Sequence, residues 1–164
     1  QEPDMIQRLQ DEDALPTQLY LSTNAADYDS FLKINKPKYN DSWQRWNKTL
    51  EMLKHLDTRT VLRITLIRNY NDQKEMIPAF ASMLKQASPH FIEIKSYMHI
   101  GRSTNRLEHS NMLEMDEVRK FSEEIAKQSQ IFSVMDESLV SRIVILQNDQ
   151  RVIDRLISTY ANTN

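Results

Sequence analysis

Cysteine is absent from the 164-residue chain, and glycine occurs only once, at Gly101. The missing thiols exclude a disulfide scaffold and a thiolate-bound metal centre built from this chain. The single glycine excludes the glycine-rich phosphate-binding loops of Rossmann and P-loop proteins. No run reaches the roughly 20 apolar residues that a membrane span requires, so we expect no membrane-embedded part. The near balance of 21 basic and 23 acidic residues disfavours a general nucleic-acid coat protein.

The residues that are present form an alternating pattern of strands and helices. Hydrophobic residues make up 40% of the chain, which is sufficient for one folded unit over residues 1–164. Periodicity predicts strands at 18–23, 60–67, 91–97, 131–135 and 142–146. It predicts helices at 4–10, 42–56, 73–86, 116–128 and 150–158, and a short helix or turn at 26–34. This alternation predicts an α/β fold of parallel strands with outer helices, in which the last strands belong to a tail segment, 130–164.

The three strands before the tail segment each combine an apolar side with a polar side. Arg63 and Thr65 alternate with leucine and isoleucine in the strand at 60–67, and the strands at 18–23 and 91–97 show the same alternation. A solvated outer face would explain the pattern, but helices usually cover both faces of a parallel sheet. Because charged side chains are costly to bury without partners, we favour a polar, ligand-filled interior. Functional groups are then expected at the carboxyl ends of the strands.

Two side chains near the third strand could take part in chemistry. Lys95 lies two residues after Glu93, so it could form a Schiff base beside a neighbouring base. The alternative is an ion pair of Glu93 with Lys95 or Arg63 that only fills the interior. His99 follows the strand and could act as an acid, a base or a contact group, or have no role in function. The four histidines do not have the spacing of metal ligands, so no metal site is predicted.

Two basic segments are compatible with binding to phosphate groups. The loop 99–106 contains two arginines among small hydrogen-bonding residues. Three lysines at positions 33, 36 and 38 lie beside Tyr39, and basic residues next to an aromatic residue are also found in nucleic-acid-binding proteins. A solvated surface is the alternative interpretation of both segments.

Five segments carry a resemblance to a known enzyme family. They are PTQLYLSTNA (16–25), the KINKP–W segment (33–46), RTVLRITLIRNYN (59–71), FIEIKSYMHIGRSTNRL (91–107) and MDESLVSRIVILQND (135–149). In this order, and over nearly the whole chain, they resemble the archaeal-type 4-demethylwyosine synthases, the radical S-adenosylmethionine enzymes of tRNA wyosine synthesis.

The resemblance implies a partial (β/α)6 barrel, of which this chain would be the C-terminal half. The family holds a 4Fe–4S cluster on a three-cysteine motif, and reductive cleavage of S-adenosylmethionine gives a 5′-deoxyadenosyl radical. The radical drives the condensation of pyruvate with N1-methylguanosine-37 of phenylalanine tRNA to give 4-demethylwyosine. Because the chain has no cysteine, we expect the cluster ligands and a pyruvate-binding lysine upstream of Gln1, and no activity from this chain alone.

Carried over residue by residue, the resemblance assigns no catalytic residue and no metal ligand to this chain. It implies S-adenosylmethionine contacts at the ends and inner faces of the strands, from Ser22, Asn24, Arg63, Thr65 and Lys95. It implies substrate contacts from the third strand and the loop after it, from Tyr97, His99, Arg102, Ser103 and Arg106. It leaves the roles of Ser141 and Arg142 in the tail segment undefined.

The resemblance also implies a cytoplasmic monomer that binds tRNA and pyruvate and does not bind membranes. Two other functions are compatible with the residues. The chain could come from an aldolase-like lyase that forms its Schiff base on Lys95, or from a non-catalytic tRNA-binding module derived from an enzyme half. Borohydride trapping with a keto acid tests the first alternative, and cleavage of S-adenosylmethionine by the full-length protein tests the second.

Overall fold

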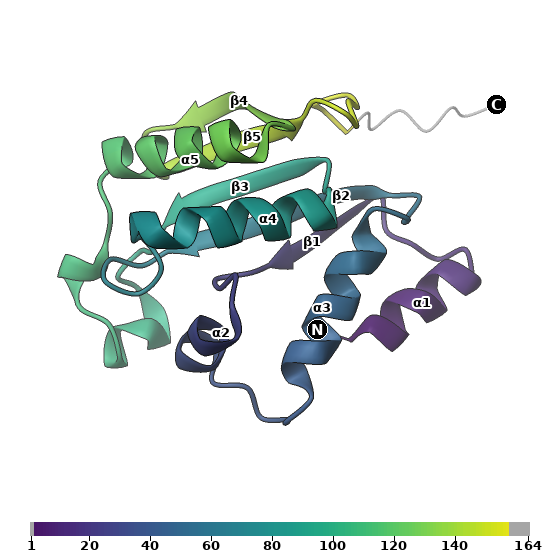
Figure 1. The fold of residues 1–164 in the computed structure, drawn as a ribbon, viewed down its shortest axis with the longest axis horizontal. Helices are drawn as coiled ribbons and strands as arrows, with labels where there is room; N and C mark the ends of the chain where they lie inside the picture. Colours follow the sequence, from purple (N-terminus) through teal and green to yellow (C-terminus); the bar gives the residue numbers. More distant parts are fainter. Residues whose placement is uncertain (1, 158–164) are drawn as a thin grey trace.

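A computed structural model describes residues 2–157, which form a five-stranded sheet with helices packed against it (Figure 1). The strands are β1 Gln18–Ser22, β2 Arg59–Leu66, β3 Phe91–Ser96, β4 Phe132–Ser138 and β5 Ile143–Asn148. The α-helices are α1 Pro3–Asp11, α2 Tyr28–Asn35, α3 Ser42–Leu53, α4 Ile77–Ala87 and α5 Met115–Ser129. Short 3-10 helices are η1 Lys74–Met76, η2 Gly101–Asn105 and η3 His109–Asn111. Within residues 2–157, none of the helices has the length and apolar character needed to cross a membrane.

The sheet is mixed, with the strand order β1-β2-β3-β5-β4. The first three strands are parallel, as predicted, with Leu21 opposite Leu62 and Leu62 opposite Ile92. β5 is antiparallel to β3, and β4 is antiparallel to β5, so the prediction of parallel strands is wrong for the tail segment. The physical reason is the length of the connection. Residues 139–142 join β4 to β5, and parallel strands need a crossover of about a dozen residues or more.

The end of the chain also differs from the prediction. Residues 149–157 contain no helix where one was predicted over 150–158, and residue 158 lies outside the described residues. Val152 and Leu156 are 66% and 77% exposed, so a short helix here would bury too little apolar surface to be stable. The segment is instead held by Arg155, whose carbonyl accepts a hydrogen bond from Arg59 Nη1 at 2.8 Å and whose side chain pairs with Asp136.

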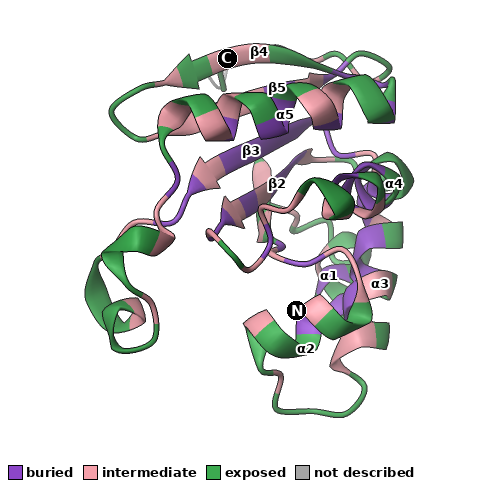
Figure 2. Ribbon diagram, turned by 60° about the vertical axis from the view of Figure 1, so that its left-hand side comes forward, coloured by how far each residue is buried: buried purple, intermediate pink, exposed green. Residues whose placement is uncertain are grey.

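The hydrophobic core lies between one face of the sheet and the layer of α3, α4 and α5 (Figures 1 and 2). Alternation in the strands sends every second side chain into this layer. The large, fully buried side chains are Trp46, Leu53, Leu62, Ile64, Leu66, Phe80, Leu84, Ile92, Ile94, Val118, Ile125 and Leu146. Burial of each aliphatic or aromatic side chain contributes roughly 1.5–3 kcal/mol. The other face of the sheet is therefore left for the polar residues of the same strands.

Several turns adopt the left-handed backbone conformation without glycine. Lys36, Ser88 and Gln130 directly follow α2, α4 and α5 with φ values of 45°, 43° and 60°. Glycine is the residue most often found at this position, because it lacks a Cβ that strains the backbone. The single glycine, Gly101, has φ 63°, and a Cβ added to it would meet no heavy atom within 4 Å. Backbone conformation rather than lack of space therefore explains glycine at 101.

Candidate functional site

One face of β1, β2 and β3 has no helix of residues 2–157 packed across it (Figure 1). We call this the open face and define it by its polar side chains, which are Tyr20, Ser22, Arg63, Thr65, Glu93 and Lys95. Parallel register places Ser22 beside Arg63, and Thr65 beside Lys95. Four of the five residues predicted to contact S-adenosylmethionine thus lie together on this face.

Glu93 is the centre of the polar contacts on the open face. Its side chain is only 10% exposed, and its Oε1 accepts a hydrogen bond from Arg63 Nε at 2.7 Å. Its Oε2 accepts a hydrogen bond from the Tyr20 hydroxyl. The Arg63 guanidinium also lies over the Tyr20 ring, 4.6 Å from the centroid. Both carboxylate oxygens therefore have charge-assisted or hydroxyl partners, which offsets the cost of burying the charge.

Burial, together with the neighbouring Glu93 carboxylate, raises the pKa of Tyr20 to about 12. The phenol therefore stays protonated at neutral pH and remains a hydrogen-bond donor to Glu93. Sequence reasoning placed Tyr20 and Glu93 on the polar side of their strands but did not select them as site residues. Their positions two residues from Ser22 and Lys95 were the signal, because residues two apart on a strand share a face.

Lys95 does not form the ion pair that was one interpretation of its position. It is half-buried at the edge of the open face, and its side chain has no hydrogen bond or ion pair with any of residues 2–157. Both oxygens of Glu93 are occupied by Arg63 and Tyr20 instead. The ammonium group of Lys95 is thus a cation that a ligand can contact.

Asn24, the fifth predicted cofactor residue, lies at the end of β1 and joins this strand to β2. Its Oδ1 accepts a hydrogen bond from Thr65 N at 3.1 Å. Asn71, which the sequence analysis did not select, is fully buried and donates through Nδ2 to the carbonyls of Asn24 and Thr65, both at 2.9 Å. Asn71 Oδ1 accepts from Ile67 N at 2.6 Å. The Nδ2 group of Asn24 is the part of its amide that remains for a ligand.

A cavity of about 410 Å³ opens at the carboxyl end of β1. Ser22 and Asn24 form one wall, and the segment between α2 and α3 forms the other wall with Pro37 and Tyr39. Its volume lies within the range of small-molecule sites, roughly 300–1,000 Å³. The cavity lies where a parallel strand ends, which is the position at which functional groups are expected in such folds.

The residues predicted to contact substrate differ in their surroundings. Tyr97 is buried, and its hydroxyl lies 3.1 Å from His99 Nδ1. The His99 ring is partly exposed and lies 6.0 Å from the His109 ring, centroid to centroid. Tyr97 therefore orients His99, which is the member of the pair that a ligand can reach.

The other three predicted substrate residues lie in the loop after β3. This segment, residues 98–112, projects from the sheet, and we call it the projecting loop (Figure 2). Arg102 and Arg106 are exposed, whereas the Ser103 hydroxyl donates to the carbonyl of Ile100 at 2.7 Å. The two arginines are free to contact a large partner, and Ser103 shapes the turn.

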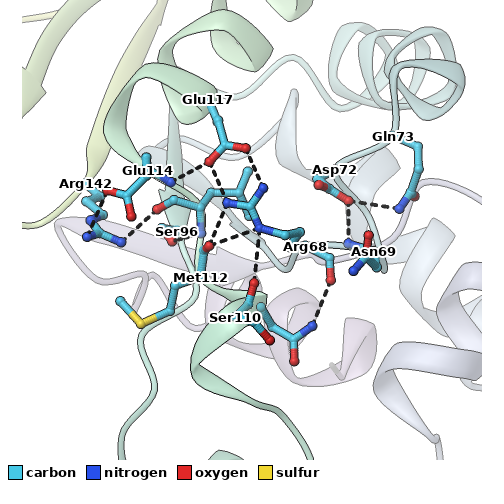
Figure 3. A network of polar contacts seen from close by, with 12 residues as sticks. Arg68, Asn69, Asp72, Gln73, Ser96, Ser110, Met112, Glu114, Glu117 and Arg142 are labelled. Carbon is cyan, nitrogen blue, oxygen red and sulfur yellow. Dashed lines mark hydrogen bonds and ion pairs between the residues drawn. The ribbon is translucent and has the colours of Figure 1, made fainter.

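Arg68 fixes the base of the projecting loop (Figure 3). Its Nε donates to the carbonyl of Ser110 at 3.1 Å, and its Nη2 donates to the carbonyl of Met112 at 2.9 Å. Its two terminal nitrogens also donate to the carboxylate oxygens of Glu117 at 2.5 and 2.6 Å. These hydrogen bonds lower the pKa of Glu117. Because planar guanidinium groups favour such bidentate contacts, one side chain joins β2, η3 and α5.

Arg142 takes part in the same network, whereas Ser141 does not. Arg142 Nη1 donates to the carbonyl of Leu113 at 2.9 Å, and Nη2 lies 3.1 Å from a carboxylate oxygen of Glu114 (Figure 3). Ser141 is exposed in the turn between β4 and β5. The contacts of Arg142 give it a structural role at the start of α5.

The resemblance implies two bound groups, S-adenosylmethionine and a 4Fe–4S cluster, and the residues of this chain fit only the first. Hydroxyl, amide, guanidinium and ammonium groups gather on the open face and at the end of β1, and they match the ribose and carboxylate of S-adenosylmethionine. The chain does not fit an iron–sulfur cluster, because it has no cysteine. Among the described residues, no group of three or more His, Cys, Asp or Glu side chains is placed to hold a metal ion.

The fold and the polar open face define a mixed α/β domain with one helix-free polar face. The family model described as Wyosine base formation matches residues 86–148, from the end of α4 to the end of β5.

Curated proteins and a solved structure are similar to nearly the whole chain. The tRNA 4-demethylwyosine synthase of Methanocaldococcus jannaschii is 40% identical over 151 residues, which cover 92% of this chain and 45% of the relative. The corresponding synthase of Pyrococcus abyssi is 36% identical over 147 residues, covering 90% and 42%. A solved structure of TYW1 with a lysine–pyruvate adduct bound has a TM-score of 0.79 and 39% identity, covering 92% of this chain and 45% of that chain.

The chain is therefore related to the tRNA 4-demethylwyosine synthases and matches their C-terminal half, as the resemblance predicted. It spans less than half the length of these relatives.

Proposed function

We propose that this chain is the part of a tRNA 4-demethylwyosine synthase that supplies the open face as one wall of the active site. The remaining part of the protein would complete a partial (β/α)6 barrel and hold the iron–sulfur cluster. The reaction is the condensation of pyruvate with N1-methylguanosine-37 of phenylalanine tRNA. The main support is the Tyr20–Arg63–Glu93 group on a helix-free face of parallel strands, in a chain that shares 39% identity with a TYW1 structure.

The open face suits contacts to S-adenosylmethionine. Arg63, held in place by Glu93, and Lys95 would bind the carboxylate of the cofactor. Ser22 and the Nδ2 group of Asn24 would bind its ribose hydroxyls at the cavity beside β1. Thr65 lies next to Lys95 and adds a further hydroxyl. When bound, S-adenosylmethionine supplies the radical chemistry, and the side chains of this chain orient the reacting groups and exclude water.

The projecting loop suits contacts to tRNA. Arg102 and Arg106 are exposed and would bind phosphate groups of the RNA backbone. His99, oriented by Tyr97, would line the path of the target base. The guanine must leave its stack to reach the open face of the sheet, as bases do in other enzymes that modify them.

The full-length protein, reconstituted with iron and sulfide, tests this proposal. It is incubated with S-adenosylmethionine, a reductant, ¹³C-labelled pyruvate and phenylalanine tRNA that carries N1-methylguanosine-37. We expect cleavage of S-adenosylmethionine and transfer of label into one nucleoside, detected by mass spectrometry. Unmethylated tRNA is the control and should gain no label. Binding of tRNA without cleavage of S-adenosylmethionine would contradict the proposal and favour a non-catalytic tRNA-binding module.

A further inference from the structure

A small aromatic pocket lies outside the open face, between α2 and the start of α3. Its volume is about 190 Å³, and its lining includes Tyr28, Phe31, Pro37, Tyr39 and Trp43. Trp43 lies 5.2 Å from Phe31 and 6.1 Å from Tyr28, ring centroid to ring centroid. This volume is below the roughly 300 Å³ at which drug-sized sites begin, so the pocket suits a single flat group.

The aromatic rings divide into a floor and a rim. Phe31 is 3% exposed and Trp43 is half-buried, so both pack against the core and form the floor. Tyr39 is 60% exposed and Tyr28 is 47% exposed, so both form a rim that solvent reaches. Packing of the hydrophobic core therefore does not explain the aromatic side chains of Tyr28 and Tyr39. Asn40 also lines the pocket and adds an amide that can donate and accept hydrogen bonds.

Three lysines lie in the chain segment that contributes Phe31, Pro37 and Tyr39 to this pocket. Lys33, Lys36 and Lys38 are exposed and form no ion pair with any of residues 2–157. Lys38 Nζ lies 5.5 Å from the centroid of the Tyr39 ring, and Lys33 Nζ lies 5.2 Å from that of Tyr70. Cations beside exposed aromatic rings match the phosphate and the base of one nucleotide.

The pocket adjoins the cavity of the candidate active site and shares part of its wall. Phe31, Pro37 and Tyr39 line both the aromatic pocket and the 410 Å³ cavity, whose opposite wall contains Ser22 and Asn24. A ligand in the aromatic pocket is therefore a direct neighbour of a ligand at the end of β1. When an RNA strand is splayed open, the bases of two adjacent nucleotides can occupy two neighbouring sites in this way.

We propose that the aromatic pocket binds the base of a nucleotide adjacent to the modified guanosine, with Lys36 and Lys38 at its phosphate. This inference rests on the proposed function and adds a second base-binding site to it. Stacking of unpaired bases on aromatic side chains is a general mode of single-strand RNA recognition, and Tyr39 supplies the exposed ring for it. Holding a neighbouring base here keeps the target nucleotide unstacked and directed towards the open face.

The test uses the full-length protein and an anticodon stem-loop that contains N1-methylguanosine-37. 2-Aminopurine replaces the base on either side of the target, at position 36 or 38, because its fluorescence falls when it stacks. We expect quenching at one of the two positions on binding to the wild-type protein. Tyr39→Ala should remove this quenching and raise the Kd roughly tenfold. Tyr39→Trp should preserve the quenching and the Kd, because tryptophan retains an aromatic face.

Charge variants test the phosphate contact. The double variant Lys36→Gln/Lys38→Gln should weaken binding and reduce the salt dependence of Kd, since fewer counterions are released. Lys127→Gln and Val140→Ala, at exposed positions on α5 and in the β4–β5 turn, are the matched controls and should bind RNA like the wild-type protein. Circular dichroism spectra and melting temperatures should match those of the wild-type protein in every variant, which verifies folding.

Two results overturn the inference or its basis, and they are distinguishable. If Tyr39→Ala binds the stem-loop with wild-type affinity and unchanged fluorescence, the pocket does not hold a base. If the wild-type protein itself does not bind the stem-loop, the proposed function fails before the pocket is tested.

Discussion

At the scale of single residues, the open face depends on a carboxylate that is buried but fully partnered. Glu93 receives hydrogen bonds from a guanidinium and a phenol that come from two other strands. Removing one partner from such a group leaves a buried polar atom unsatisfied, which costs about 1–3 kcal/mol. Lys95, on the same strand and the same face, has no such partners among residues 2–157. These two side chains should therefore respond differently to substitution.

We predict that Tyr20→Phe and Glu93→Gln each lower the free energy of unfolding by about 1–3 kcal/mol. Tyr20→Phe leaves one carboxylate oxygen without its hydroxyl donor, and Glu93→Gln removes the charge that pairs with Arg63. Urea titration of the full-length protein measures both effects. Lys95→Gln is the control and should change stability by less than about 0.5 kcal/mol. If all three variants lower the free energy of unfolding equally, the contacts of Glu93 make no specific contribution to stability.

If the protein forms a lysine adduct with pyruvate, as the similar TYW1 structure does, we expect a lysine other than Lys95 to carry it. An amine that forms a Schiff base needs a neighbouring group to move protons, and the nearest carboxylate on its strand, Glu93, is occupied by Arg63 and Tyr20. We expect borohydride trapping of the full-length protein with pyruvate to proceed equally in wild type and Lys95→Met. Peptide mapping that finds the adduct on Lys95 would support the aldolase-like alternative instead.

The sequence predicted which residues share the open face, but not which of them contact one another. Alternation along a strand determines the face of each side chain, so Ser22, Arg63, Thr65 and Lys95 were placed correctly relative to the sheet. Partner choice depends on the register between strands, which brings Arg63 rather than Lys95 to Glu93. Register follows from packing across the whole sheet and cannot be derived from the pattern of one strand.

At the scale of elements, Arg68 holds the projecting loop to the sheet. We predict that Arg68→Lys lowers the free energy of unfolding by about 2 kcal/mol, because one ammonium cannot replace donors to two carbonyls and a carboxylate. Hydrogen exchange should also become faster over residues 106–117. Arg119→Lys is the matched control, since Arg119 is equally exposed at 33% but pairs only with surface carboxylates. Arg119→Lys should lower the free energy of unfolding by less than about 1 kcal/mol.

The long periodic elements were predictable, and the short connections were not. Apolar spacing gave α3 and α5 to within a few residues, because each buries a continuous stripe in the core. The two η helices of the projecting loop carry no such stripe. Hydrogen bonds from the Arg68 side chain to the Ser110 carbonyl and from the Asn111 side chain to the Arg68 carbonyl hold η3. The direction of β5 was missed because a hairpin and a crossover leave the same pattern within the strand itself.

At the scale of the whole molecule, His90 makes stability depend on pH. It is 8% exposed, and burial together with the charges of Arg151 and Arg59 lowers its pKa to about 4. Its Nδ1 accepts a hydrogen bond from Thr60 N at 3.1 Å, which requires that this nitrogen carries no proton. The folded protein therefore favours neutral His90, whereas the unfolded chain protonates it near pH 6.5.

We predict that this contribution to stability is complete above pH 6.5 and is lost progressively as the pH falls towards 4, because protons bind more tightly to the unfolded state. At pH 5 the loss should reach up to about 2 kcal/mol. Thermal melts of wild type and His90→Asn between pH 7.5 and 5 measure it, since asparagine keeps an acceptor but does not titrate. Parallel declines in melting temperature for the two proteins would contradict the assignment to His90.

Because the chain has one glycine, residues with a Cβ occupy left-handed positions at the ends of its helices. Glycine at such a position can increase the stability of the protein. Gln130 closes α5 in the left-handed conformation, and its side chain is exposed. Gln130→Gly should relieve backbone strain and increase the free energy of unfolding by up to about 1 kcal/mol, visible as a higher melting temperature. A lower melting temperature would show that the extra chain entropy of glycine outweighs the relief. Thermal tolerance can thus be engineered at a helix terminus, remote from every residue that is proposed to touch a ligand.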